Sequence, residues 1–250
     1  MKKELLLLII QTCPLYSSLS NQQKPLIISL GFSCEPALMA RTFNIRHAAF
    51  PLDWLGSYEF EKVCLAIQEH FAHFLDRKYL TYNTVYIKNE YYNFAFFHDF
   101  PNIGLTNISQ EYENNGTIVP DFLTYLEKIQ AKYEVRINRF YETLNGPNPI
   151  YFFRTHISPK EAQIFIHLIS LLYPNLIYKL IVTNYKNEHE FDWNKPQVIN
   201  FWPIERNPIY KNIWFSVEEW RNIFIKLGLI TKSMIFNTSI EELCVNHMPA

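Results

Sequence analysis

The stretch LIISLGFSCEPALMARTF, residues 26–43, predicts the fold of this chain. Residues 26–30 form an apolar run of strand length, which is typical of a strand buried on both faces of a parallel sheet. Residues 31–33 form a turn, and a helix is expected over residues 34–43, with a proline tolerated in its first turn. This order places Cys34 at a helix N-terminus, at the carboxyl edge of the sheet.

A second strand–helix–strand pattern is predicted between residues 150 and 183. Its helix begins at Ser158-Pro159-Lys160-Glu161, where a Ser cap, a proline at the first helical position and a reciprocal Glu form a capping box. The flanking runs, 150–153 and 176–183, should be parallel strands joined by a right-handed crossover. The other expected elements are a helix over 57–75, hairpin strands over 84–87 and 91–97, a helix over 121–144, a strand over 198–201 and a last helix that begins at a second capping box, Ser216 to Glu219.

Together these elements predict a single α/β domain over residues 21–250, with a mainly parallel sheet flanked by helices. Apolar residues make up 48% of the chain and charged residues 19%, which is typical of a globular protein. The net charge of −1, without a basic block, argues against nucleic acid as a partner. The sequence has no GxGxxG or Walker motif and no metal-type Cys/His spacing, so neither a cofactor nor a metal site is expected.

Residues 1–20 have the order of a secretory signal peptide. Lys2 and Lys3 precede an apolar run over 5–10, and small residues follow over 18–20. We therefore expect a periplasmic or secreted protein. No transmembrane anchor is expected after cleavage, because no other apolar run approaches the ~18 residues of a membrane span. If the run is instead a buried strand or helix at the start of the domain, the protein is cytoplasmic.

Three cysteines follow the leader: Cys34, Cys64 and Cys244. An odd number in an exported chain leaves at least one thiol free, whether or not Cys64 and Cys244 pair. Cys34 is the strongest candidate for a reactive thiol, because the unpaired N–H groups and the dipole of a helix N-terminus favour the thiolate. The carboxyl edge of an open α/β sheet is also where such folds place their sites. The alternative is a small apolar side chain packed beneath the turn.

A thiolate nucleophile requires a base, usually a histidine, and a group that orients this base. His98 ends an aromatic strand shortly before Pro101 and is the first candidate base. His156, between a strand and a helix, is the second candidate, and His47 is the third. Each of them can instead be a capping or core histidine.

Several segments resemble an uncharacterised bacterial family described as papain-like cysteine peptidases. They are Ile28-Ser29-Leu30-Gly31-Phe32-Ser33-Cys34-Glu35-Pro36-Ala37, Phe50-Pro51-Leu52-Asp53-Trp54 and Phe97-His98-Asp99-Phe100, with Arg136 to Phe140 and Phe152-Phe153-Arg154-Thr155 as later landmarks. The resemblance covers most of the chain after the leader. It implies papain's α+β architecture as the alternative to the α/β fold.

The resemblance also implies roles for individual residues. Cys34 would be the nucleophile, His98 its base, and Asp53 the orienting or substrate-contacting acid. Asp99 is a less favoured orienting acid, because adjacent side chains on a strand point to opposite faces.

Three arginines are candidates for binding a substrate carboxylate or phosphate: Arg136, Arg139 and Arg154. Guanidinium groups bind such anions through paired hydrogen bonds. The alternative is that these arginines are solvated or salt-bridged.

The leading interpretation is a cysteine hydrolase or acyl-transferase that acts on a peptide, amide or ester through an acyl-thioester. Cys34 would attack the carbonyl, His98 would carry the proton, and backbone N–H groups at the helix start would hold the oxyanion. The rival interpretation is a carbohydrate- or phosphate-handling transferase or binding module, in which the turn at Gly31 holds an anion and Cys34 is structural. A non-catalytic interaction domain is the third interpretation.

Overall fold

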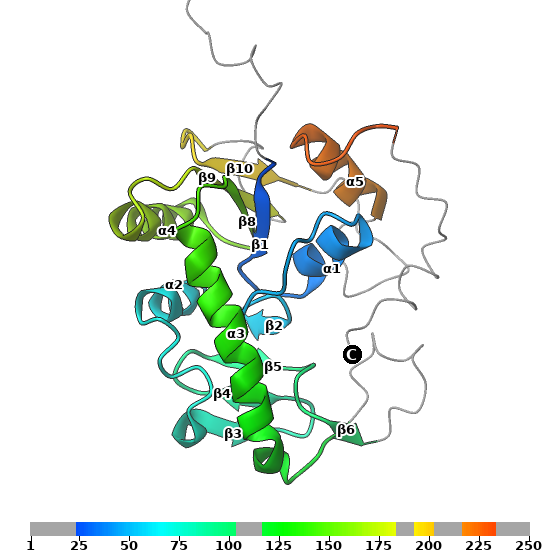
Figure 1. Cartoon of the computed structure of the whole chain (residues 1–250), viewed down its shortest axis with the longest axis vertical. Coiled ribbons are helices and arrows are strands. Elements are labelled where there is room, and N and C mark those ends of the chain that lie inside the picture. The colour runs from blue at the N-terminus through cyan, green and yellow to red at the C-terminus, as the bar shows by residue number, and fades with distance from the viewer. Residues whose placement is uncertain (1–23, 104–116, 184–192, 203–216, 234–250) are drawn as a thin grey trace, which may run out of the picture.

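The structure is a computed structural model that describes residues 24–103, 117–183, 193–202 and 217–233. A parallel sheet lies in the upper part of Figure 1 and an antiparallel sheet in the lower part, and helix α3 (Leu126–Leu144) crosses in front of both. The predicted leader, residues 1–20, lies outside the described ranges. Within those ranges no helix is both long and apolar enough to cross a membrane.

The parallel sheet confirms the predicted α/β fold. Its strands are β1 (Leu26–Ser29), β8 (Ile150–Thr155), β9 (Tyr178–Thr183) and β10 (Val198–Phe201), in the spatial order β1-β8-β9-β10. Every neighbouring pair is parallel. The strands at each end of the predicted crossover therefore share one sheet, as expected for a strand–helix–strand unit.

Side chains of the parallel sheet alternate between two separate cores, as the period of two along a strand requires. One core lies under α2 (Phe60–Gln68), α3 and α4 (Pro159–Leu172) and receives Ile28, Phe152 and Leu180. The other lies under α1 (Glu35–Thr42) and α5 (Val217–Lys226) and receives Ile27, Phe153 and Ile181. The sheet is therefore covered by helices on both faces, which explains why its strands read as nearly continuous apolar runs.

The capping box of α4 is present as predicted. The Ser158 hydroxyl accepts from the Glu161 N–H, and the Glu161 carboxylate accepts from the Ser158 N–H. The second predicted capping residue, Ser216, lies outside the described residues, and α5 is described from Val217.

Two helix predictions were too long. Instead of 57–75, α2 spans Phe60–Gln68, because the chain before it forms strand β2 and His70 and Phe71 after it have positive φ values of 53° and 56°. Instead of 121–144, α3 begins at Leu126, after a 3-10 helix over Phe122–Tyr125.

The antiparallel sheet contains β2 (Leu55–Ser57), β3 (Leu80–Tyr82), β4 (Ile87–Asn89) and β5 (Phe94–Phe96), in the order β2-β5-β4-β3. A small separate pair joins β6 (Asn102–Ile103) to β7 (Thr117–Ile118). The predicted hairpin exists as the β4–β5 pair, but its turn is shifted. The Asn89 side chain accepts from the Tyr92 N–H at 2.8 Å and Asn93 has a φ of 54°, so the turn follows β4 instead of interrupting it.

Candidate active site

Cys34 lies where the sequence predicts, at the N-cap of α1 just beyond the carboxyl end of β1. The turn before it has unusual backbone geometry, since Gly31 and Phe32 have φ values of 81° and 72°. Glycine adopts this conformation readily, but phenylalanine rarely does. The Gly31 N–H donates to the Ser29 hydroxyl at 3.3 Å and the Phe32 N–H to the Ser57 hydroxyl at 2.8 Å. These bonds fix the turn that leads to the thiol.

Two backbone N–H groups lie beside the thiol without a partner in another described residue. The N–H groups of Ser33 and Cys34 donate to no other residue of the described ranges, and the Cys34 N–H interacts with its own sulfur, which lowers the pKa of the thiol. The Glu35 N–H reaches the Ser33 hydroxyl only at 3.4 Å, and Pro36 has no N–H to offer. Unpaired N–H groups next to a nucleophile are the donors that an oxyanion hole requires.

The Cys34 side chain is partly buried and packs against the core under α1 and α5. Burial raises the pKa of this thiol to about 11, and the neighbouring Glu35 carboxylate raises it further. This direction is opposite to the lowered pKa that we expected from the helix N-terminus, so desolvation outweighs the helix-terminus effect. The resting thiol is therefore protonated at neutral pH.

Cys64, in α2, is buried in the larger core, and its pKa is also raised by burial, to about 12. Both described cysteines are free thiols. Cys244 lies outside the described residues, so pairing between Cys64 and Cys244 stays an open expectation.

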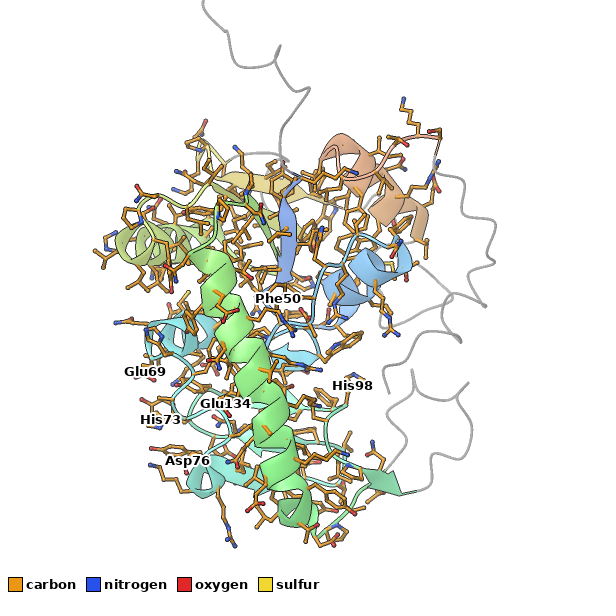
Figure 2. The ribbon with its side chains drawn as sticks, in the orientation of Figure 1. Phe50, Glu69, His73, Asp76, His98 and Glu134 are labelled. Carbon is orange, nitrogen blue, oxygen red and sulfur yellow. The ribbon has the colours of Figure 1, made fainter. Side chains whose placement is uncertain are left out.

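His98 follows β5 and is connected to the Cys34 side of the molecule through Trp54. The rings of His98 and Trp54 meet edge to face with centroids 6.1 Å apart, and Trp54 belongs to the core against which Cys34 packs. In Figure 2, His98 lies on the α1 side of helix α3, whereas Glu69, His73 and Asp76 lie on the opposite side. Among the described residues no hydrogen bond joins the His98 ring to the Cys34 thiol.

The pKa of the His98 imidazole is lowered, which favours its neutral form. His98 is exposed on one side, but the protein around the ring desolvates it and so lowers its pKa. The Asp99 carboxylate partly opposes this shift. A neutral imidazole offers one nitrogen as a proton acceptor, which is the state that a general base needs.

Asp53 stabilises the loop in which it lies, through contacts with Arg46 and Phe50. Its carboxylate is 2% exposed, accepts from the Phe50 N–H at 2.9 Å and forms an ion pair with Arg46. Burial raises the pKa of Asp53, while Arg46 acts in the opposite direction. The Arg46 guanidinium lies 5.5 Å from the centre of the Trp54 ring. Asp53 therefore acts on the loop that carries Trp54, and no described imidazole contacts its carboxylate.

Asp99, which the sequence made the less favoured acid, fixes the segment that carries His98. Its carboxylate is buried and binds three residues of α3: Lys132 at 2.5 Å, the Tyr133 hydroxyl at 2.7 Å and Arg136 at 4.0 Å. Lys132 and Tyr133 precede Arg136 by four and three residues, so both lie next to Arg136 on the helix surface. The Lys-Tyr-x-x-Arg spacing in the sequence indicates that these three side chains can bind a common acceptor. The sequence around them does not identify Asp99 as that acceptor.

Of the three arginines considered for substrate binding, Arg136 faces Asp99, and Arg139 and Arg154 occupy two different positions. Arg139 donates from Nη1 to the Ala49 carbonyl at 2.9 Å and so connects α3 to the loop that contains Asp53. Arg154 is fully buried, and burial lowers its pKa to about 9. Its guanidinium lies beneath the turn that precedes Cys34, and not at a surface where a substrate anion could reach it.

The other two candidate bases are also described. His156 follows β8, has a φ of 55°, and its ring lies 4.8 Å from the Phe32 ring between centroids. His47 is exposed. Within the described residues no group of three His, Cys, Asp or Glu side chains has the arrangement of a metal site.

The described residues therefore define an α/β protein with a thiol at a helix N-terminus, two N–H groups beside it that donate to no other described residue, and an imidazole whose ring meets Trp54 of the core against which the thiol packs. Residues 25–187 match the family described as "Putative papain-like cysteine peptidase (DUF1796)". This match spans more than half of the chain, so the chain belongs to that family, as the sequence motifs predicted. No match was found among the curated proteins or the solved structures.

Proposed function

We propose that this protein is a cysteine hydrolase or acyl-transferase in which Cys34 is the nucleophile and His98 is the base. The observation that carries the proposal is the position of Cys34 at the start of α1, beside the N–H groups of Ser33 and Cys34, which donate to no other described residue. His98 is favoured as the base because it contacts Trp54, which lies in the core against which Cys34 packs.

The pKa directions indicate how the reaction begins. The raised pKa of Cys34 and the lowered pKa of His98 favour a neutral thiol and a neutral imidazole over a thiolate–imidazolium pair. The proton would pass from sulfur to the imidazole as sulfur attacks the carbonyl carbon of a peptide, amide or ester. The N–H groups of Ser33 and Cys34 would bind the resulting oxyanion, and the imidazolium would give its proton to the departing nitrogen or oxygen. Water or an acceptor nucleophile would then release the acyl group from the thioester.

The rival anion-binding interpretation is weakened by one residue. Glu35 stands in the first turn of α1, and its side chain is 2% exposed. A carboxylate at this helix start opposes the binding of a phosphate or carboxylate, and its oxygen already accepts from the Trp220 ring N–H at 2.8 Å. An acyl carbonyl carries no charge before attack and meets less of this repulsion.

The proposal is tested by acylation with p-nitrophenyl acetate followed by peptide mapping in a mass spectrometer. We expect an acetyl adduct at Cys34, its loss in Cys34→Ser, and acylation roughly 10²- to 10⁴-fold slower in His98→Ala, the usual range for a general base. His73→Ala is the matched control, because His73 lies on the opposite side of α3 (Figure 2). Equal labelling of Cys34 and Cys64, or equal slowing by the two histidine variants, would contradict the proposal.

We also propose that residues 1–20 are removed during export. N-terminal sequencing of the exported protein from its native host should begin near Asn21, because small residues precede this position. A cytosolic product that retains Met1 would exclude export.

A further inference from the structure

Arg154 is a buried cation held by neutral groups. Its Nη1 donates to the Leu30 carbonyl at 2.9 Å and to the Ser57 hydroxyl at 2.8 Å, and its Nη2 donates to the Ser57 carbonyl at 2.5 Å. The side chain is 0% exposed, and within the described residues it forms no ion pair with a carboxylate. The Glu161 carboxylate raises the pKa of Arg154 from a longer range, but without an ion pair the burial of a guanidinium opposes folding. We therefore expect the Arg154 guanidinium to fix the positions of the groups to which it donates.

Ser57 is the point at which Arg154 reaches the turn before Cys34. Its hydroxyl oxygen accepts from Arg154 and, at 2.8 Å, from the Phe32 N–H. A Cβ atom added at Gly31 would lie 2.2 Å from this oxygen, so the backbone of the turn passes directly against the hydroxyl. Arg154, Ser57 and the Phe32 amide thus form a continuous series of hydrogen bonds from β8 to the turn.

The same series connects the two sheets. Ser57 is the last residue of β2, in the antiparallel sheet, whereas Leu30 follows β1 and Arg154 belongs to β8, in the parallel sheet. The turn therefore cannot move relative to β2 without breaking a bond to the Ser57 hydroxyl. Phe32 also packs on the guanidinium, whose central carbon lies 5.6 Å from its ring centre.

We propose that Ser57 and Arg154 are positioning residues that hold the 31–33 turn, and through it the Cys34 thiol and the N–H groups of Ser33 and Cys34, in the geometry required for acyl transfer. This inference rests on the proposed function for its catalytic part. Neither side chain contacts the substrate, because both are buried, and both act through the backbone of the turn.

This role predicts opposite effects on two reactions of the same thiol. In Ser57→Ala, the Phe32 N–H and Arg154 lose a shared acceptor, the turn relaxes and water reaches Cys34. Alkylation by iodoacetamide at pH 7 should rise about tenfold, the increase in thiolate that accompanies a decrease of one pKa unit. Acylation by p-nitrophenyl acetate should fall at least about tenfold, because this reaction also needs the positioned N–H groups.

The experiment compares both rates, from pH 6 to 10, in wild type, Ser57→Ala, Ser57→Thr and Asn89→Ala. Ser57→Thr keeps the hydroxyl and should restore most of the acylation rate. Asn89→Ala is the matched control, because Asn89 is a fully buried side chain of the antiparallel sheet that also accepts a backbone N–H, from Tyr92. The positioning role predicts that Asn89→Ala lowers stability but leaves the pH profile of Cys34 unchanged. Equal changes in the profiles of Ser57→Ala and Asn89→Ala, or no change in either, would overturn it.

A measurement on the wild-type protein covers the case in which Ser57→Ala does not fold. The Phe32 amide should exchange its hydrogen at least about tenfold more slowly than the Ser33 amide, because only the former has an acceptor. Equal exchange at the two positions would overturn the inference. If wild type shows no acylation while Ser57→Ala still changes alkylation of Cys34, the proposed function fails and the effect of Ser57 on the turn stands.

Discussion

The two sheets differ in what they contribute to the candidate site. The parallel sheet, with buried apolar strands and helices on both faces, supplies the turn that carries Cys34. The antiparallel sheet has strands of three residues each and supplies the segments that carry Trp54 and His98. The proposed nucleophile and its proposed base thus come from different sheets, and the alignment between the sheets decides whether they meet.

Two groups of polar contacts keep these sheets aligned. Arg154 and Ser57 connect β8 to β2 beneath the turn. Asp99 connects the segment after β5 to α3, which packs on the shared core. Arg154, Ser57 and the Asp99 carboxylate are buried, so these contacts are expected to contribute more to stability than exposed pairs would.

The largest effect is expected from Arg154→Ala, which breaks the connection between the sheets. The change removes the guanidinium donor from the Leu30 and Ser57 carbonyls and one of the two donors to the Ser57 hydroxyl, and it opens a cavity, so the free energy of unfolding should fall by roughly 4 kcal/mol or more. Urea denaturation measures this loss. Arg139→Ala, which removes one bond from a partly exposed arginine, should cost about 1 kcal/mol. Similar losses in the two variants would show that Arg154 does not connect the sheets.

A smaller effect is expected from Asp99→Asn, which keeps an acceptor for Tyr133 but removes the charge that faces Lys132 and Arg136. The free energy of unfolding should fall by about 1–3 kcal/mol, the usual range for a hydrogen bond to a charged group. Since the Asp99 carboxylate raises the pKa of His98, its removal should lower that pKa further.

An NMR titration of the His98 ring separates the two acids. The Asp53→Asn variant is the control, because the Asp53 carboxylate contacts Arg46 and Phe50 instead of an imidazole. If Asp53→Asn shifts the His98 titration more than Asp99→Asn does, then Asp53 is the orienting acid that the family resemblance implied.

The smallest effect concerns pH. Because the pKa of His98 is lowered in the folded protein, the unfolded chain binds this proton first as the pH falls. The contribution of His98 to stability is fully present above its unfolded pKa of ~6.5 and is lost as the pH falls through the lower, folded-state pKa. Urea midpoints at pH 7.5 and 5.5 should therefore differ less in His98→Gln than in wild type. An unchanged difference would assign this pH dependence to other groups.

The sequence predicted the parallel sheet well and the antiparallel sheet poorly, for a physical reason. Strands covered on both faces are apolar throughout, and a capping box marks the helix between them, so both signals are local. Strands of three residues are too short to show an alternation, and the turn after β4 depends on a side-chain bond from Asn89.

The candidate site, like the fold, was predictable only where its residues depend on local sequence. Cys34 followed from a local order of strand, turn and helix. The role of Arg154 did not, because its partner Ser57 lies 97 residues away in the sequence. An arginine inside an otherwise apolar strand of a parallel sheet was nevertheless a signal of burial, since such a strand has no solvent-facing side.

The backbone conformation of Cys34 determines how the Cys34→Ser substitution affects the stability of the protein. Its φ of −75° and ψ of −7° are already helical, and its side chain does not cap the first turn of α1. Serine usually stabilises a helix from the N-cap only when that residue is extended, so Cys34→Ser should neither gain a capping bond nor lose one. The variant would keep the stability and shape of the natural protein while a weaker hydroxyl nucleophile replaces the thiol. Under the proposed function it is therefore suited to retain a bound substrate long enough for that substrate to be identified.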